Sequence, residues 1–344
     1  MKNNKAPKLD DVARLAGVSK ATVSHVLNRR GYLSQDTIRK VEQAVKDLNY
    51  HPNTVARQLY KQKTDIIGMI FPTVDNPFFC QLEAEIEQCL EREGYQVLMC
   101  NSKNNPEMEE RYLKNLLTRQ IDGLIIGSHN QHLRGYQHSE LPIVAIDKNI
   151  DENVPVVSSD NYQGGMLATK RLIADGCRHI FHTNGPLEFD SPVQERRRAF
   201  EQVMDENEMP AITYHLGFNA TLEEKERVFS QLFTEHPEVD GIFASDDMDA
   251  SFLISLAKRF GKRVPEDLKI IGYDGANTTR FLRPELTTIR QPIDQIAQVA
   301  VQLLLARINN CPVKSAMEIR VTSTSSFTLL YIVRVSFAVF LPAG

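Results

Sequence analysis

Residues 9–28 read LDDVARLAGVSKATVSHVLN, and this stretch decides the fold of the N-terminal part of the chain. Apolar side chains recur at helical spacing over residues 9–16, and Gly17 follows where a helix would end. Ser19 can cap a second helix by accepting a hydrogen bond from the backbone near Thr22. The spacing therefore predicts two short helices joined by a tight turn.

A third helix is expected downstream, where Ser34 can cap it and apolar side chains recur over residues 38–48. The sequence Tyr50-His51-Pro52 should end it. Three short helices with a glycine-containing turn between the first two form a helix-turn-helix module, whose second helix enters the major groove of DNA. The outward side chains near the start of that helix are Lys20, Ala21, Thr22, Ser24 and His25.

These side chains suit both base edges and phosphates. Lys20 or His25 can donate to the O6 and N7 atoms of guanine. Ala21 or the methyl group of Thr22 can contact the thymine methyl group, while the hydroxyl groups of Thr22 and Ser24 can bond to phosphate.

The distribution of charge supports a nucleic-acid partner. The chain has a formal net charge of -4, yet residues 1–63 hold 13 Lys and Arg against 5 Asp and Glu, and residues 64–344 hold 27 against 39. Such asymmetry indicates that the basic part binds a polyanion. The alternatives are a solvated lysine-rich tail and a small helical module for protein contacts. Helical periodicity combined with positive charge favours DNA.

Composition describes a folded protein of about two to three domains. The chain has 344 residues, of which 42% are hydrophobic and 24% charged. Its five cysteines form neither an even set nor a C-x-x-C pair, which argues against a disulfide framework and a zinc ribbon. We expect a cytoplasmic protein, because the N-terminus also lacks the apolar core of a secretory signal.

From residue 65 onward, short apolar runs alternate with longer amphipathic segments. The predicted strands are 66–72, 95–100, 123–127, 142–147, 179–183, 241–245 and 268–274. Helical patterns between them include 79–94, 109–120, 164–176 and 291–308. Continuously apolar strands separated by helices indicate an α/β fold of doubly wound parallel sheets, buried on both faces.

In such folds a ligand binds at the carboxyl ends of the strands. The polar residues predicted there are Thr73 to Asn76, Asn101, Ser102, Ser128, His129, Asp147, Asp160, Asn161, Ser245 to Asp247 and Asp274. The sequence contains no G-x-G-x-x-G or Walker pattern, so nucleotide binding is not expected. Carboxylates and amides beside Phe78, Phe79 and Tyr273 suit a polyhydroxylated ligand, because each hydroxyl group both donates and accepts. The alternative for any single polar residue is that it only caps a helix.

We expect neither an enzyme nor a metal or cofactor site. His129, His132 and His138 lie in a polar segment without the register of a catalytic metal site. Asp246 and Asp247 are adjacent, so their carboxylates point in different directions and no acid–base partner is evident. The sequence also lacks a Ser or Cys nucleophile motif.

The N-terminal 59 residues resemble the DNA-binding headpiece of the LacI/GalR family of bacterial repressors almost without a gap. The resemblance rests on the V-A-x-x-A-G-V-S turn, the T-V-S-x-V-L-N recognition helix and the Y-x-P-N-x-x-A-R-x-L linker. It implies DNA contacts along the recognition helix from Ser19 to Asn28. It also implies a hinge helix that forms on operator DNA, with Leu59 wedged into the minor groove and Asn53 and Ala56 beside it.

The remainder resembles the family's periplasmic-binding-protein-like core, in which two α/β lobes joined by three crossings hold an effector between them. Matching stretches include FPTVDNPFF (71–79), DGLIIGSHN (122–130) and IIGYDG (270–275), and the pattern is most similar to family members that regulate sucrose operons in Gram-positive bacteria. The resemblance assigns the effector to Asp147, Arg196, Ser245, Asp246 and Asp274. The strand-end pattern adds Asp75, Phe78 and Ser128.

The resemblance implies three regions: a headpiece over residues 1–50, a hinge over 51–63, and an effector-binding and dimerisation core over 64–344. Within the core we expect an N-lobe of about 64–161 and 291–318 and a C-lobe of about 162–290 and 319–344. A palindromic operator requires a homodimer, and no heptad extension follows that would make a coiled-coil tetramer.

The functional hypothesis is a transcriptional repressor that binds double-stranded operator DNA with an affinity set by a small sugar or sugar phosphate. A regulator of another sugar or nucleoside operon, and a sugar-binding protein that does not bind DNA, are the alternatives. The sequence after Met317 departs from the family pattern. Its apolar part, 327–341, is shorter than the roughly 20 residues of a membrane span, so we interpret it as an atypical terminus, such as an altered reading frame would produce. This leaves the last strand of the C-lobe open.

Overall fold

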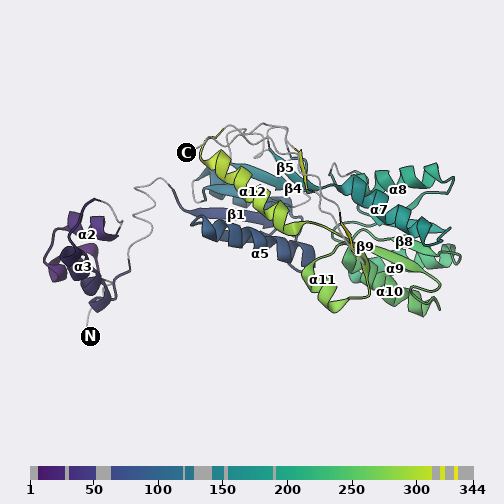
Figure 1. Ribbon diagram of the computed structural model, residues 1–344, viewed down its shortest axis with the longest axis horizontal. Coiled ribbons are helices and arrows are strands. Elements are labelled where there is room, and N and C mark those ends of the chain that lie inside the picture. The colour runs from purple at the N-terminus through teal and green to yellow at the C-terminus, as the bar shows by residue number, and fades with distance from the viewer. Residues whose placement is uncertain are drawn as a thin grey trace. The chain divides into compact units, whose positions relative to one another are not determined.

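The computed structural model describes residues 7–27, 31–51, 63–118, 121–127, 142–150, 154–188, 191–311, 318–321 and 329–331. The chain forms two compact units, residues 1–63 and 64–344 (Figure 1). Each unit has hydrophobic clusters of its own. No helix within the described residues is long and apolar enough to cross a membrane.

The first unit contains the three predicted helices: α1 (Leu9–Ala16), α2 (Lys20–Leu27) and α3 (Gln35–Asp47). Gly17 ends α1 in the left-handed conformation, with a φ of 66°. The Ser19 hydroxyl oxygen accepts from the backbone N–H of Thr22 at 3.1 Å, and Ser34 caps α3 in the same way. Fully buried valines from all three helices pack together, so the helix-turn-helix prediction is confirmed.

The first sheet of the second unit has the strand order β11-β5-β4-β3-β1-β2, and its described pairs are parallel. Its strands are β1 (Ile66–Phe71), β2 (Gln96–Asn101), β3 (Gly123–Ile126), β4 (Ile143–Ile146), β5 (Val156–Ser159) and β11 (Glu318–Val321). Helices α5 (Pro77–Arg92) and α12 (Ile293–Ile308) lie together on one face (Figure 1). Helix α6 (Pro106–Leu117) packs on the other.

The second sheet has the order β12-β10-β9-β8-β6-β7 and is also parallel. Its strands are β6 (Ile180–Asn184), β7 (Ile212–His215), β8 (Gly241–Phe243), β9 (Lys269–Asp274), β10 (Thr287–Arg290) and β12 (Leu329–Tyr331). Helices α7 (Asn161–Ala174) and α8 (Gln194–Glu206) pack on one face. Helices α9 (Leu222–Glu235) and α10 (Asp247–Arg259) pack on the other, and α11 (Asn277–Leu282) follows β9.

The described elements pass from one sheet to the other after β5, after β10 and after β11. β11 pairs with β5 from Glu318 to Val321 and completes the edge of the first sheet, so this sheet reaches slightly past the expected N-lobe boundary of about residue 318. The last strand of the second sheet, left open by the atypical sequence, is β12, which pairs with β10. The doubly wound α/β prediction is confirmed.

Candidate functional site

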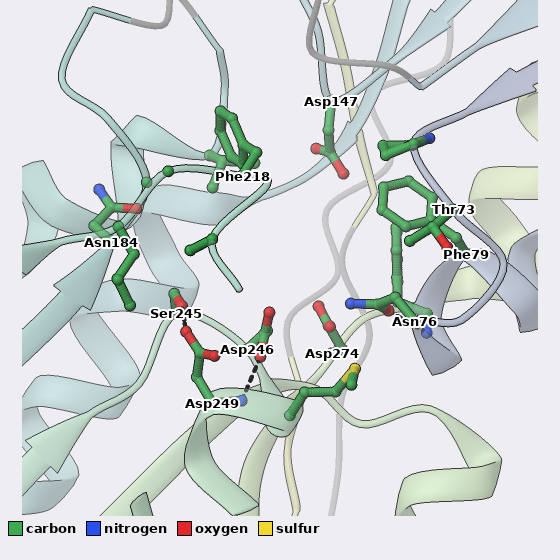
Figure 2. A pocket seen from close by; sticks show the side chains of 18 of the residues that line it. Thr73, Asn76, Phe79, Asp147, Asn184, Phe218, Ser245, Asp246, Asp249 and Asp274 are labelled. Atoms are coloured by element: carbon green, nitrogen blue, oxygen red, sulfur yellow. Dashed lines mark hydrogen bonds between the residues drawn. The ribbon is translucent and has the colours of Figure 1, made fainter. Parts of the chain in front are cut away.

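A cavity of about 300 Å³ lies where the carboxyl ends of the two sheets face each other (Figure 2). This is the place where parallel α/β sheets bind ligands. The first sheet and its loops contribute Pro72, Thr73, Asp75, Asn76, Phe78, Phe79, Asn104, Gly127 and Asp147. The second contributes Asn184, Gly185, Val193, Arg196, Leu216, Gly217, Phe218, Ala220, Lys225, Ser245, Asp246, Met248, Asp249, Asp274 and Gln291.

Seven of the eight side chains predicted to meet the effector line this cavity. They are Asp75, Phe78, Asp147, Arg196, Ser245, Asp246 and Asp274. Ser128 lies outside the described residues. Side chains separated by up to 199 positions in the sequence therefore meet at one place, as the strand-end rule requires.

Arg196 differs from the other two arginines of its run. Its side chain is buried, and its guanidinium carbon lies 3.5 Å from the ring centroid of Tyr273. Its Nε donates to Asn161 Oδ1 at 2.8 Å, and its Nη1 donates to the carbonyl of Ser245 at 2.9 Å. Arg197 and Arg198 instead form ion pairs with glutamates of α8. Arg196 is thus held rigidly against the cavity while its neighbours lie on the outer part of the helix.

Asp147 follows β4 and reaches the cavity from the first lobe. Its φ of 49° places it in the left-handed region, which aspartate tolerates better than most residues. Its carboxylate accepts from Asn161 Nδ2 at 3.2 Å, and its carbonyl accepts from the Ser191 hydroxyl at 2.6 Å. Asn161 therefore contacts both Asp147 and Arg196, and it connects the charged groups of the two lobes.

A compact acidic group lies at the start of α10. The Asp246 carboxylate caps the helix by accepting from the backbone N–H of Asp249 at 2.7 Å. The Ser245 hydroxyl donates to Asp249 Oδ2 at 2.9 Å, and Figure 2 shows both bonds. Lys225 of α9 forms an ion pair with the other oxygen of Asp249. Burial, reinforced by the nearby charge of Asp249, raises the pKa of Asp246.

Asp274 lies at the end of β9 beside a further buried carboxyl group, that of Asp247. Burial, and next the charge of Asp247, raise the pKa of Asp274 well above its usual range. Gln291 Nε2 donates to Asp274 Oδ1 at 2.8 Å. Burial likewise raises the pKa of Asp247, although Thr288 and the backbone N–H of Gly275 donate to it. The floor of the cavity is therefore lined by buried carboxyl groups that ionise less readily than usual.

Aromatic rings flank the polar floor on opposite walls. Figure 2 shows Phe79 on the wall from the first lobe and Phe218 on the wall from the second. Phe79 contacts Phe78 in an edge-on arrangement with ring centroids 5.2 Å apart. A Cβ at Gly185 would lie 2.9 Å from the Phe218 ring, so glycine is required for that ring to pack there. Polar groups below apolar rings suit a ligand with hydroxyl groups and C–H faces.

The sequence did not identify several lining residues. Lys225 and Asp249 lie on helices rather than at strand ends, and Gln291 and Phe218 follow strands with few apolar residues. Asp249 could have been found from the sequence, because an aspartate three residues after the helix-capping Asp246, before an apolar helical run, is a typical pattern at a helix start. No comparable signal pointed to Lys225.

The DNA-binding candidates of the first unit gather on α2. Lys20, Ala21 and His25 are exposed, whereas Thr22 and Ser24 are half-buried. Lys20 Nζ lies 3.1 Å from Asp10 of α1, an exposed ion pair that contributes little to stability. The remaining candidates, Asn28, Asn53, Ala56 and Leu59, lie outside the described residues. Throughout the described part of the chain, no group of three or more His, Cys, Asp and Glu could hold a metal ion.

A helix-turn-helix unit followed by a two-lobed core with a polar cavity is the architecture of a ligand-responsive DNA-binding regulator. A family model described as bacterial regulatory proteins of the lacI family matches residues 8–53. A second, described as periplasmic binding proteins and sugar binding domain of the LacI family, matches residues 64–328. The chain belongs to the LacI family.

Individual relatives agree with this assignment. The sucrose operon repressor of Pediococcus pentosaceus is 41% identical over 94% of this chain and 99% of its own length. The ribose operon repressor of Halalkalibacterium halodurans is 39% identical over 88% of this chain and 90% of its own. The crystal structure of the lac repressor dimer bound to operator and the anti-inducer ONPF has a TM-score of 0.78 at 26% identity, covering 91% of this chain and 97% of that one. The chain is a DNA-binding transcriptional repressor and not an enzyme.

Proposed function

We propose that this repressor controls a sugar-utilisation operon, with sucrose or a related sugar as effector, and that the sugar binds in the cavity between the lobes. The observation that carries the proposal is the convergence of Asp147, Arg196, Ser245, Asp246 and Asp274 on one cavity with aromatic walls. The similarity to a sucrose operon repressor over nearly the whole chain supports sucrose.

The ribose operon is the second candidate, because a ribose operon repressor is almost as similar to this chain. A panel of sucrose, glucose, fructose and ribose, tested by thermal unfolding of the full chain, separates the two. A ligand present at about 100 times its dissociation constant adds about 2.7 kcal/mol of stability. Stabilisation by sucrose or one of its component sugars supports the first candidate, and stabilisation by ribose alone supports the second. A panel without any stabilising sugar would contradict both.

For the DNA-binding part we propose a headpiece over residues 1–50 and a hinge over 51–63. In this scheme α2 lies in the major groove with Ser19, Lys20, Ala21, Thr22, Ser24, His25 and Asn28 at the DNA. Asn53, Ala56 and Leu59 of the hinge would contact the minor groove, with Leu59 as an apolar wedge. The core over 64–344 would bind the effector and a second copy.

We also propose that the protein acts as a homodimer. Two headpieces must reach half-sites about 34–36 Å apart on a palindromic operator. In the second unit, Phe281 and Leu282 at the end of α11 are 85% and 67% exposed, which is unusual for large apolar side chains next to each other. These two exposed apolar side chains suit a contact with a second copy of the chain. As a bacterial protein that binds operator DNA, it would work in the cytoplasm and associate with the nucleoid when bound.

The recognition helix is tested by Lys20→Ala on an operator selected from random DNA by the full chain. If Lys20 contacts a base, the variant should lose preference at one position of each half-site, by about 1–3 kcal/mol. Lys40→Ala removes the same charge from α3, where Lys40 pairs with Asp36, and should not alter base preference. Uniform weakening on all sequences by Lys20→Ala would place Lys20 on a phosphate instead.

A further inference from the structure

The ionic groups of the effector cavity are strongly unbalanced. Among the described lining residues, the acidic side chains are those of Asp75, Asp147, Asp246, Asp249 and Asp274. The cations in the same lining are Arg196 and Lys225. Burial and mutual repulsion already raise the pKa of Asp246 and Asp274. A negatively charged ligand group placed here would meet the same cost of burial, together with repulsion from those carboxylates that are ionised.

The cation best placed to attract an anionic ligand is already paired. Lys225 Nζ forms an ion pair with Asp249 Oδ1, and the Asp249 side chain is 95% buried. Ser245 donates to the other carboxylate oxygen at 2.9 Å. Both oxygens of Asp249 thus have fixed partners, and the carboxylate holds the ammonium group in place.

The second cation is likewise occupied. Arg196 donates to Asn161 and to the Ser245 carbonyl, and its guanidinium plane stacks over Tyr273. A phosphate bound in the Nε/Nη2 fork of this guanidinium would have to replace the hydrogen bond from Nε to Asn161. A sugar hydroxyl group, by contrast, can accept from one remaining N–H without displacing it.

Phosphates are also bound by free backbone N–H groups at helix N-termini, but three helices that begin at or next to this cavity, α5, α9 and α10, are capped by their own side-chain oxygens. Asn76 caps α5 by accepting from the backbone of Phe78 at 2.8 Å. Thr221 caps α9, next to the lining residue Ala220, and Asp246 caps α10. The caps place side-chain oxygens where a phosphate would need donors.

We propose that the cavity selects an uncharged, unphosphorylated sugar, and that Asp249, by neutralising Lys225, is a specificity-determining residue that excludes phosphate esters. This inference rests on the proposed function and narrows it to one chemical class. The carboxylates that repel a phosphate accept hydrogen bonds from sugar hydroxyl groups, so the same residues favour one class and reject the other.

The test compares each neutral sugar with its own ester by isothermal titration calorimetry on the full chain. The probe pairs are sucrose and sucrose 6-phosphate, glucose and glucose 6-phosphate, fructose and fructose 6-phosphate, and ribose and ribose 5-phosphate. We expect the neutral member of the binding pair to bind at least about tenfold more tightly at low ionic strength, with the ratio shrinking as salt is added. An ester that binds as tightly as its neutral sugar, or more tightly, overturns the proposal. If no member of any pair binds, the sugar-responsive function itself fails, which is a different result.

Asp249→Asn tests the assigned residue, because it releases Lys225 while keeping the shape of the side chain. The ester should then gain affinity relative to the neutral sugar by about tenfold. Asp75→Asn is the matched control, because it also removes a carboxylate from the lining. The hydrogen bond that the structure shows for Asp75 is made by its backbone N–H, to the Thr73 hydroxyl group, and not by its side chain to Lys225. Asp75→Asn should change the ratio of ester affinity to neutral-sugar affinity less than Asp249→Asn does. An equal effect of both variants, or none from Asp249→Asn, overturns the role of Asp249.

Lys225→Met keeps the proposal testable if Asp249→Asn unfolds the lobe. Removing the cation leaves Asp249 as a charge without its ammonium partner, so discrimination against the ester should increase. A Lys225→Met protein that binds the ester more tightly than wild type contradicts the proposal.

Discussion

At the scale of single residues, burial distinguishes Arg196 from its neighbours in the sequence. The sequence QERRRAF offers three arginines in a row, and a charge run of this kind usually forms a solvated helix face. Arg196 alone of the three is buried, stacked on Tyr273 and hydrogen-bonded to Asn161 and to the Ser245 carbonyl. Its partners fix the direction of the guanidinium group before any ligand arrives.

Arg196→Ala should therefore remove the response to the effector. Hydrogen bonds to charged groups contribute about 1.5–3 kcal/mol, so sugar affinity should fall by roughly 10- to 150-fold. Operator binding without sugar should stay near wild type. Arg198→Ala is the control, because Arg198 lies on the same helix, is exposed and pairs with Glu195. Titrating sugar into the protein–operator complex measures both, and a normal response from Arg196→Ala would remove this residue from the site.

Asp247 gives the protein a defined pH dependence. Burial raises its pKa from 3.8 to about 7 in the folded protein. Because the folded state holds the proton more tightly than the unfolded chain, the carboxyl group stabilises the fold at pH below about 4, and this contribution is lost as the pH rises towards 7. Asp247→Asn should lose less stability than wild type between pH 5 and 8, by on the order of 1–3 kcal/mol.

Urea unfolding of the full chain at several pH values measures this difference. Asp205→Asn, on an exposed position of α8, controls for the general loss of one charge. Parallel pH profiles for wild type and Asp247→Asn would show that the carboxyl group of Asp247 does not titrate in this range.

At the scale of elements, the close approach of α7 and α8 positions Arg196. A Cβ on Gly165 of α7 would lie 2.5 Å from the carbonyl oxygen of Arg196 and 2.9 Å from the Cβ of Ala199. On the other side of the helix, a Cβ on Gly164 would enter the ring of Tyr273. Because neither glycine has a side chain, α7 can pack closely against the backbone of Arg196 and against the Tyr273 ring on which Arg196 stacks.

Gly165→Ala should push α8 away from α7 and destabilise the second lobe by about 1–3 kcal/mol, as overpacking does. Because the contact is with the backbone of Arg196, sugar affinity should fall as well. Gly217→Ala serves as the stability control, since nothing lies within 4 Å of a Cβ there. Equal unfolding free energies for wild type and Gly165→Ala would show that the helices adjust without cost.

The elements that could be predicted from the sequence are those with a strong pattern. All seven apolar runs are strands. Most are buried on both faces of a parallel sheet, which needs apolar residues at successive positions, whereas β2 lies at a sheet edge and is partly exposed. β5, with the sequence VVSS, was not identified as a strand although it is fully buried. β7 is half-exposed at a sheet edge, and its composition, ITYH, carries little apolar signal.

The same limit applies to the site. Residues at strand ends were predictable, because parallel strands bring their carboxyl ends together whatever the details of packing. Lys225 was not, because its place in the cavity depends on how α9 packs beside α10 and on its pairing with Asp249. Tertiary contact of this kind leaves no periodic trace in the sequence.

At the scale of the whole molecule, hydrogen bonds cross directly from one lobe of the core to the other. Asn104 of the first lobe donates to Asn219 of the second at 2.8 Å, and the backbone of Asn277 donates to Gln81 at 2.8 Å. These bonds and the ligand cavity lie between the same two lobes. A sugar that binds one arrangement of the lobes more tightly than another shifts the equilibrium towards the first arrangement. If the two arrangements also differ in operator affinity, sugar binding changes operator affinity, by at most the ratio of the sugar's affinities for the two arrangements.

The central claim is therefore a thermodynamic coupling between the sugar cavity and the operator. The most direct measurement is the affinity of the full chain for its selected operator, by fluorescence anisotropy, with and without a saturating neutral sugar that stabilises the protein. Operator affinity should change by about 5- to 150-fold, and sugar affinity measured with and without operator should change by the same factor. The contradicting result is a sugar that binds in the cavity while operator affinity is the same with and without sugar, and sugar affinity is the same with and without operator. The protein would then not be a sugar-controlled repressor.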